Sequence, residues 1–433
     1  MPVSPPPGSP LAADAPTESA PARISLFVGK GGVGKSTLAT ATAVRAARAG
    51  RRVLIVSTDQ AHSTGDVLGA EVAPTGQRAP TRVLADMDTG SEAGGFLDAL
   101  ALDTLALLEA RWVEVAETLS ARFPESDLGN VAPEELSALP GIQEVLGLYE
   151  VGELAESGRW DHVVVDCAST ADALRMLTLP ETFGLYLERA WPRHRRLSGT
   201  ADAATATIVA LMERIDAGLR RVGSLLTDPS RVGAHLVLTP ERVVAAEAAR
   251  TLGSLALMGV EVTELLVNQI LVQDDSFEYH NLPAHPAFDW YTERIGEQRA
   301  VLDELDATIG DVSLVLVPHL AGEPIGPKAL AELLDAARSR DGSPPPGPLR
   351  PIVDRESGSG LEAIYRLRLE LPQVDSAALT LGRVDDDLII GVGAMRRRVR
   401  LASVLRRCIV ADASLRGSQL TVRFRPNPEV WPV

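Results

Sequence analysis

A glycine-rich loop between an apolar run and an alanine-rich run is the feature that most restricts the fold of this chain. The loop reads GKGGVGKST over residues 29–37, after ISLFV at 24–28 and before TLATATAVRAARA. Glycines let backbone N–H groups curl around a phosphate, and the positive end of a following helix adds to the attraction. The order strand, loop, helix therefore predicts a nucleotide phosphate site in an α/β fold.

The loop also carries the two polar side chains that such a site needs. Its spacing satisfies GxxxxGK[ST], so Lys35 is predicted to contact the β- and γ-phosphates and Ser36 to offer a hydroxyl to Mg²⁺. The predicted nucleotide-binding residues of the loop are Gly29, Lys30, Gly31, Gly32, Val33, Gly34, Lys35, Ser36 and Thr37.

Further short apolar runs predict the rest of the sheet. They are VLIVS at 53–57, HVVVD at 162–166, HLVLT at 235–239, ELLVN at 264–268 and LVLVP at 314–318. Continuous apolar runs separated by helix-length segments indicate a mostly parallel sheet that is covered on both faces. Asp166 ends one of these runs, where a carboxylate could reach Mg²⁺ through a water molecule.

Composition changes along the chain divide it into predicted parts. Residues 1–22 are rich in Pro, Ala and Ser and are expected to be a disordered tail. Residues 23–341 form the α/β domain, with a helical subdomain inserted at about 92–155 and 171–228. A proline-rich linker at 342–352 precedes residues 353–433, whose period-two alternation predicts a small all-β sandwich.

Charge and cysteine content exclude several classes of function. The formal net charge of -16 disfavours nucleic acid as a partner, because phosphate backbones attract basic surfaces. Only two cysteines occur, Cys167 and Cys408, too few for a disulfide framework or a structural zinc site. No apolar run approaches the roughly 20 residues that a transmembrane helix needs. A cytoplasmic location is the resulting expectation.

A second lysine in the loop, Lys30, connects the sequence to a known family. KGGVGKST is the signature-lysine, or deviant Walker A, form of the P-loop, and VLIVSTDQAHSTGDVLG follows at 53–69. Together these segments resemble the arsenite-pump ATPases and the tail-anchored-protein targeting factors, over most of residues 23–335. The resemblance implies a P-loop NTPase that binds ATP and Mg²⁺ as a homodimer, with Lys30 reaching the partner's nucleotide.

The same resemblance gives roles to residues outside the loop. Asp59 would position and activate the attacking water and is a further candidate magnesium ligand. Asn268 and Pro318, each at the end of an apolar run, would lie beside the adenine. The implied catalytic residues are Asp59, Lys35 and Lys30. The strands at 366–390 and 420–424 resemble the α-crystallin, or small heat-shock-protein, module that some members carry.

The function that follows is an ATPase that handles a protein client by nucleotide-driven opening and closing. One alternative is a partition or division-site ATPase, which shares the loop but needs a basic DNA-binding surface or a membrane-binding helix. Another is a nucleotide-gated scaffold with negligible turnover. The scaffold is favoured by CASTADALR at 167–175, which has Ser169, Ala171 and Asp172 where the family's second switch has proline, glycine and histidine.

Overall fold

The structure is a computed structural model of the 433-residue chain. It describes residues 21–59, 63–72, 74–75, 80–85, 94–110, 112, 142–171, 173–174, 177, 213, 217–272, 285–309, 312–340, 351–371, 374, 376–393 and 395–431. Of the predicted disordered tail at 1–22, residues 1–20 lie outside this described part, as do residues 342–350 of the predicted linker at 342–352. Ala22, which was assigned to the tail, is buried, and its N–H donates to the carbonyl of Ala155.

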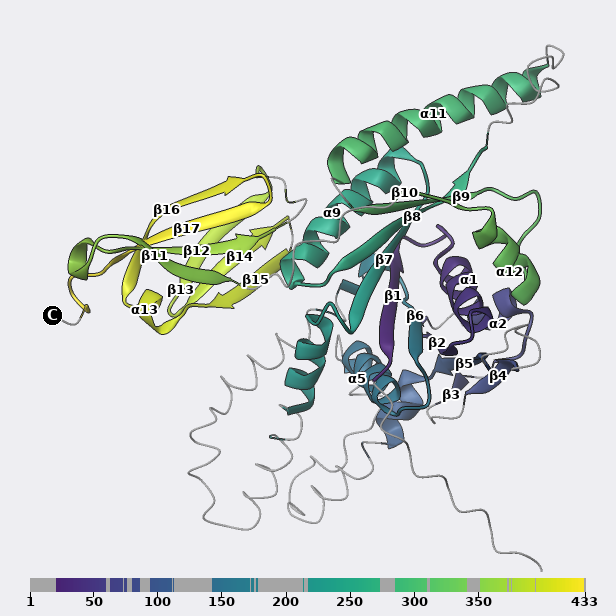
Figure 1. Cartoon of the computed structure of the whole chain (residues 1–433), viewed down its shortest axis with the longest axis horizontal. Helices are drawn as coiled ribbons and strands as arrows, with labels where there is room; N and C mark the ends of the chain where they lie inside the picture. Colours follow the sequence, from purple (N-terminus) through teal and green to yellow (C-terminus); the bar gives the residue numbers. More distant parts are fainter. Residues whose placement is uncertain are drawn as a thin grey trace, which may run out of the picture.

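A ten-stranded, mostly parallel sheet forms the larger part of the fold (Figure 1). Its strand order is β10-β9-β8-β7-β1-β6-β2-β5-β3, and β4 pairs with β5. The strands are β1 (Arg23–Gly29), β2 (Arg52–Ser57), β3 (Pro74–Thr75), β4 (Thr81–Leu84), β5 (Phe96–Leu102), β6 (His162–Asp166), β7 (Val232–Leu238), β8 (Val262–Ile270), β9 (Ser313–Pro318) and β10 (Arg338–Arg340). Among the described strands of this sheet, β4 and β10 alone pair antiparallel to a neighbour.

Helices cover both faces of this sheet, as the continuous apolar strands predicted. The structure has α1 (Lys35–Arg48), α2 (Ser63–Leu68), α5 (Ile142–Glu156), α9 (Arg242–Met258), α11 (Pro286–Ile309) and α12 (Gly326–Asp335). In Figure 1, α1, α2 and α12 lie on one side, and α5, α9 and α11 lie on the other. Four alanines of α1, namely Ala39, Ala41, Ala43 and Ala47, are fully buried, so that helix packs closely against the sheet.

The prediction that 92–155 is helical throughout is wrong at its start, because β5 occupies residues 96–102. Leu97 and Leu100 are spaced like residues on one helix face, but β5 is buried on both of its faces and pairs parallel with β2. A short, fully buried strand cannot be told from a helix by spacing alone. Helical structure follows at 104–110 and in α5, and residues 113–141 and 178–212 lie outside the described part.

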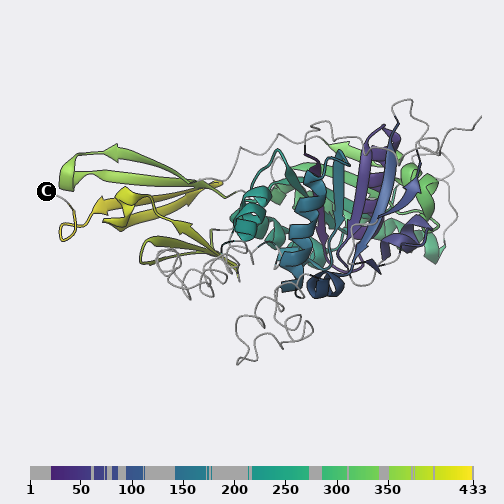
Figure 2. The ribbon, with the colours of Figure 1, turned by 90° about the horizontal axis from the view of Figure 1, so that it is seen from below.

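The C-terminal residues form a two-sheet β structure beside the large sheet (Figure 2). One sheet has the order β11-β12-β17-β16 and the other β13-β14-β15. These strands are β11 (Ile352–Ser357), β12 (Ile364–Glu370), β13 (Leu379–Val384), β14 (Asp387–Val392), β15 (Met395–Arg400), β16 (Cys408–Arg416) and β17 (Gln419–Pro426), with a short helix α13 (Ser403–Arg406). Both fold classes expected from sequence are therefore confirmed.

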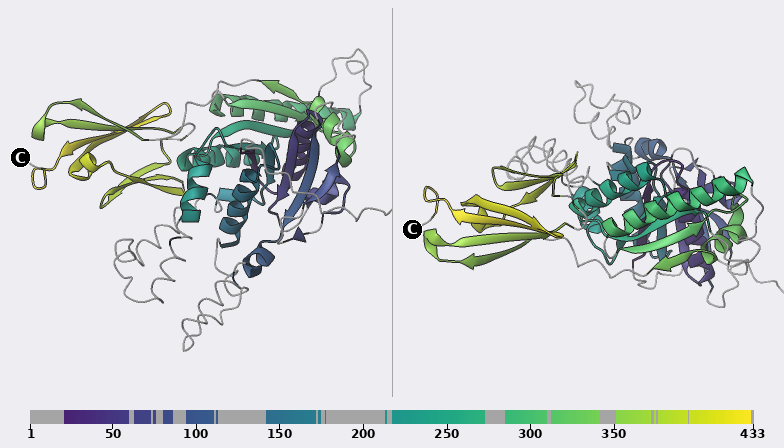
Figure 3. Two further views of the ribbon diagram at one scale, coloured as in Figure 1. Left: turned by 60° about the horizontal axis from the view of Figure 1, so that its bottom comes forward. Right: turned by 90° about the horizontal axis from the view of Figure 1, so that it is seen from above.

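The two parts meet at the last turn of α9. Leu257 belongs to α9, yet it is fully buried in the hydrophobic core of the C-terminal sheets. Arg397 of β15 donates from Nη1 to the carbonyl oxygen of Leu257 at 2.8 Å. The β domain extends away from this end of α9 in both views of Figure 3. Among the described residues, none of the helices is long and apolar enough to cross a membrane.

Candidate nucleotide site

The glycine-rich loop joins the end of β1 to the start of α1 at the carboxyl edge of the sheet. Gly32 and Gly34 have φ values of 82° and 92°, a left-handed backbone conformation that residues other than glycine rarely adopt. Gly34 is the N-cap of α1 and gives it no side-chain hydrogen bond. Because glycine has no side chain, the N-cap residue leaves the first N–H groups of the helix uncapped, which suits an anion at this position.

The two lysines of the loop occupy different environments. Lys35 is buried, and its Nζ donates to the carbonyl oxygen of Lys30 at 3.2 Å, so its charge lies inside the curve of the loop. Lys30 points outward, with 45% of its side chain exposed, and its Nζ lies 3.6 Å from Oε2 of Glu247 on α9. Lys35 is thus placed to meet phosphates of its own chain, whereas Lys30 lies at the surface.

Asn268 supports the loop from the end of β8. It is buried, and its Nδ2 donates to the carbonyl oxygen of Val33 at 3.0 Å. A Cβ atom built on Gly34 would lie 2.3 Å from this amide nitrogen. The structure therefore shows that Asn268 contacts the loop itself. This contact is additional to the position next to the adenine that the resemblance implies. Pro318 ends the neighbouring strand β9 and pairs with Ile270, so both residues lie at the same edge of the sheet.

A buried carboxylate lies directly below the start of α1. Asp166, at the end of β6, is fully buried; its Oδ2 accepts a hydrogen bond from Thr64 at 3.3 Å. Its Oδ1 has no partner among the described residues. Burial raises the pKa of Asp166 to about 6, against the opposing effects of Ser36, Lys35 and Thr64. An ionised carboxylate here needs a cation or water to compensate its burial.

The donor set around Asp166 fits a magnesium ion. The hydroxyl of Ser36 lies close enough to lower the pKa of Asp166, and Asp59 lies close enough to raise it. Mg²⁺ prefers oxygen ligands and keeps several of its waters. The orphaned Oδ1 of Asp166 could accept from such a water, and the Ser36 hydroxyl could bind directly.

Asp59 follows β2 and is half-buried, and its N–H donates to Oγ of Ser57 at 3.3 Å. The preceding residue, Thr58, donates its N–H to the carbonyl oxygen of Asp166 at 3.0 Å. Residues 60–62 lie outside the described part. The strands β2, β6 and β1 thus bring Asp59, Asp166 and the glycine-rich loop to one edge of the sheet.

Three residues of this site were missed from the sequence. Ser63 donates to Oγ of Ser36 at 2.8 Å, and Thr64 holds Asp166, both from the first turn of α2. Their hydroxyls follow the run at 53–57 by a few residues, which was an available signal. No sequence signal pointed to Glu247, the partner of Lys30. An acidic residue in a helical segment cannot be told from a solvated one by its sequence context.

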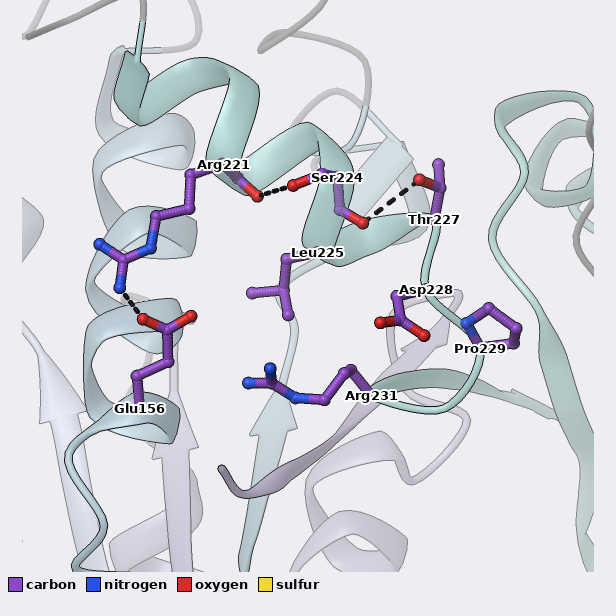
Figure 4. Close-up of a pocket in the computed structure, with 8 residues that line it drawn as sticks. All are labelled: Glu156, Arg221, Ser224, Leu225, Thr227, Asp228, Pro229 and Arg231. Atoms are coloured by element: carbon purple, nitrogen blue, oxygen red, sulfur yellow. Dashed lines mark hydrogen bonds and ion pairs between the residues drawn. The ribbon is translucent and has the colours of Figure 1, made fainter. Parts of the chain in front are cut away.

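A cavity of about 530 Å³ lies at the amino edge of the sheet, opposite the edge that carries the glycine-rich loop (Figure 4). It is bounded by the end of α5 and by the loop that leads into β7. Arg221 lines it and is paired with Glu153 and Glu156. No residue that we predicted for the site lines this cavity.

A parallel sheet with a glycine-rich loop, a buried lysine and a strand-end carboxylate defines a P-loop nucleotide-binding protein. Comparison of the sequence with those of known protein families identifies the particular family. The chain belongs to the family described as Anion-transporting ATPase, whose sequence model matches residues 22–337. A second model, described as an HSP20-like domain found in ArsA, matches residues 362–424. Both confirm the predicted family and its C-terminal module.

Individual relatives agree with this membership. Protein Rv2184c of Mycobacterium tuberculosis is 75% identical over 95% of this chain and 98% of its own length. A protein of Aquifex aeolicus with the provisional name arsenical pump-driving ATPase 1 is 25% identical over 89% of this chain and 95% of its own. The ATPase GET3 of Kluyveromyces lactis is 27% identical over 69% of this chain and 84% of its own.

Proposed function

We propose that this protein hydrolyses Mg-ATP as a homodimer and uses the resulting opening and closing to handle a protein client. The observation that carries the proposal is Oδ1 of Asp166, which has no partner within the described part of the chain and is buried beside Ser36 and Lys35 at the start of α1. A buried carboxylate oxygen without a partner is costly unless the site is built to hold a hydrated cation.

Each residue has a task in this proposal. The loop residues 29–37 would bind the phosphates through their backbone N–H groups, and Lys35 would neutralise charge on the β- and γ-phosphates. Asp59 would orient the attacking water. The Ser36 hydroxyl, and Asp166 through water, would hold Mg²⁺. The bound ion would stabilise the charge that develops on the phosphates. Asn268 would keep the loop in its curled shape through the bond to Val33.

Dimerisation is supported by the position of Lys30. Its side chain leaves the loop toward the surface, and among the described residues its one ion pair is the partly exposed pair with Glu247. Exposed pairs of this kind contribute about 1 kcal/mol or less, so Lys30 could exchange Glu247 for the phosphates of the partner's nucleotide. For client contact, the helical segments within 92–155 and 171–228 and the β domain remain the candidates.

A nucleotide-gated scaffold is the second candidate function. Its support is the altered second switch, where Ala171 replaces the family's glycine directly after Thr170, which lies close to Lys30 and Glu247. A side chain in place of glycine restricts the backbone rearrangements that a switch can make. Such a protein would bind Mg-ATP and change shape slowly or without turnover.

The test compares wild type with Asp59→Asn for Mg-ATP binding, phosphate release and mass in analytical ultracentrifugation. We expect Asp59→Asn to keep its affinity, to release phosphate about 100- to 10,000-fold more slowly, and to accumulate as a nucleotide-bound dimer. Equal rates in the two proteins would exclude the role of Asp59. ATP binding without phosphate release by wild type would favour the scaffold.

A further inference from the structure

Helix α9 contacts the nucleotide loop near one end and the β domain at the other. Glu247, in its second turn, pairs with Lys30 of the loop. Leu257, in its last turn, is buried in the core of the C-terminal sheets. Leu257 follows Glu247 by ten positions of the helix, or about 15 Å along the axis. A single helix therefore joins two parts of the molecule that have separate hydrophobic cores.

The first end of α9 lies against Lys30 of the glycine-rich loop and against Thr170 of the second switch segment. Val244, Ala248 and Thr251 are buried and share a small gap with Lys30 and Thr170, the latter at the second switch segment. The pair between Lys30 and Glu247 adds a charged contact, with side chains 45% and 33% exposed. Any movement of Lys30 away from α9 removes the only ion pair that Glu247 makes among the described contacts.

The second end is fixed more firmly. Leu257 is 1% exposed and packs with the β domain core, and Arg397 of β15 donates to the carbonyl oxygen of Leu257. Gly259 directly after the helix approaches the guanidinium of Arg397. A carbonyl in the last turn of a helix lacks a partner within the helix, so this bond caps α9 with a residue of the β domain.

We propose that Glu247 is a positioning residue for Lys30. We further propose that α9 links the release of Lys30 from Glu247, when nucleotide binds, to the packing of the β domain on the last turn of α9. The inference rests on the proposed function, since it assumes that Lys30 leaves Glu247 when ATP is bound. By linkage, a nucleotide that loosens the contact at Leu257 must itself bind more tightly when that contact is already loose. Glu247 thus holds the nucleotide-free arrangement of both parts.

The experiment is hydrogen exchange on the full chain, read at the last turn of α9 and at β14 and β15. The variant is Glu247→Gln, which removes the ion pair but leaves Lys30 in place. The matched control is Arg250→Gln, an exposed charge removed one turn further along the same helix. Wild type and both variants are measured without nucleotide and with saturating Mg-ATP.

We expect Mg-ATP to raise exchange at these segments in wild type. Glu247→Gln should raise it about two- to fivefold without nucleotide, in keeping with the modest contribution of an exposed pair, and Mg-ATP should then add little. Glu247→Gln should also bind ATP more tightly by a similar factor, which a purely structural role for Glu247 would not produce. Arg250→Gln should behave as wild type.

Unchanged exchange in nucleotide-free Glu247→Gln would overturn the link, whether or not ATP is hydrolysed. A response to ATP that is equal in wild type and Glu247→Gln would overturn it as well. Failure of the proposed function has a different signature, namely no binding of Mg-ATP to wild type, and the nucleotide-free comparison would still decide the role of Glu247.

Discussion

At the scale of single residues, the site depends on contacts between positions that are distant in sequence. Asn268 reaches Val33 across 235 residues, and the motif that predicts the loop says nothing about what supports it. The roles of Lys35, Ser36 and Asp166 follow from spacing and strand ends, which local sequence records. The ion pair of Lys30 with Glu247 and the support of the loop by Asn268 of β8 depend on tertiary packing, which local sequence does not record.

The close approach of Asn268 to Gly34 gives a prediction with an internal control. In Gly34→Ala the new methyl group would lie 2.3 Å from Nδ2 of Asn268, at a residue with φ of 92°. In Gly31→Ala the new methyl group would meet nothing within 4 Å. Strain and the lost bond should cost Gly34→Ala about 2–4 kcal/mol of unfolding free energy.

Chemical denaturation monitored by circular dichroism measures both variants without nucleotide. We expect Gly31→Ala to stay within about 0.5 kcal/mol of wild type. Equal stability of the two variants would show that Asn268 does not hold the loop as described.

At the scale of elements, the sequence predicted most strands and failed where burial hides periodicity. Strands β12 and β17 of the β domain alternate between buried residues on one face and more exposed residues on the other, so their period of two was readable. Strand β5 is buried on both faces and was mistaken for helix. The contact of α9 with the β domain was not predictable, since Leu257 looks like an ordinary core residue of its own helix.

The burial of Leu257 gives the element-scale prediction. Leu257→Ala should leave a cavity between α9 and the β domain and cost about 2–5 kcal/mol of the free energy of their contact. We expect the linker between the two parts to become more sensitive to limited proteolysis, with the melting of the large sheet little changed. The control is Leu361→Ala, which is 49% exposed in the β domain. Equal protection of the linker in both variants would contradict the docking.

At the scale of the whole molecule, the two cysteines lie in separate cores. Cys167 belongs to the core of the large sheet and Cys408 to that of the β domain. Burial raises the pKa of Cys167 to about 12, and burial also raises the pKa of Cys408. Soft metals and metalloids bind thiolates that converge within bonding distance. Both thiols are therefore protonated near neutral pH and far from forming a shared site within one chain.

We accordingly expect ATP hydrolysis to be indifferent to arsenite and to zinc-specific chelators, although the chain belongs to the Anion-transporting ATPase family. The double variant Cys167→Ser, Cys408→Ser should keep the oligomeric state of wild type in sedimentation. Since both thiols are buried, Cys→Ala versions control for the cost of burying a hydroxyl. Arsenite stimulation that disappears in both double variants would contradict this prediction.

The central claim is that Mg-ATP is bound and hydrolysed at the loop of residues 29–37. The most direct measurement is Mg-ATP affinity together with phosphate release at saturating Mg-ATP, in wild type and Lys35→Ala. Because Lys35 lies buried inside the loop, its loss should reduce hydrolysis at least about 100-fold and weaken ATP binding. Removal of Mg²⁺ by EDTA should abolish turnover of wild type. Wild-type affinity and turnover in Lys35→Ala would contradict the claim.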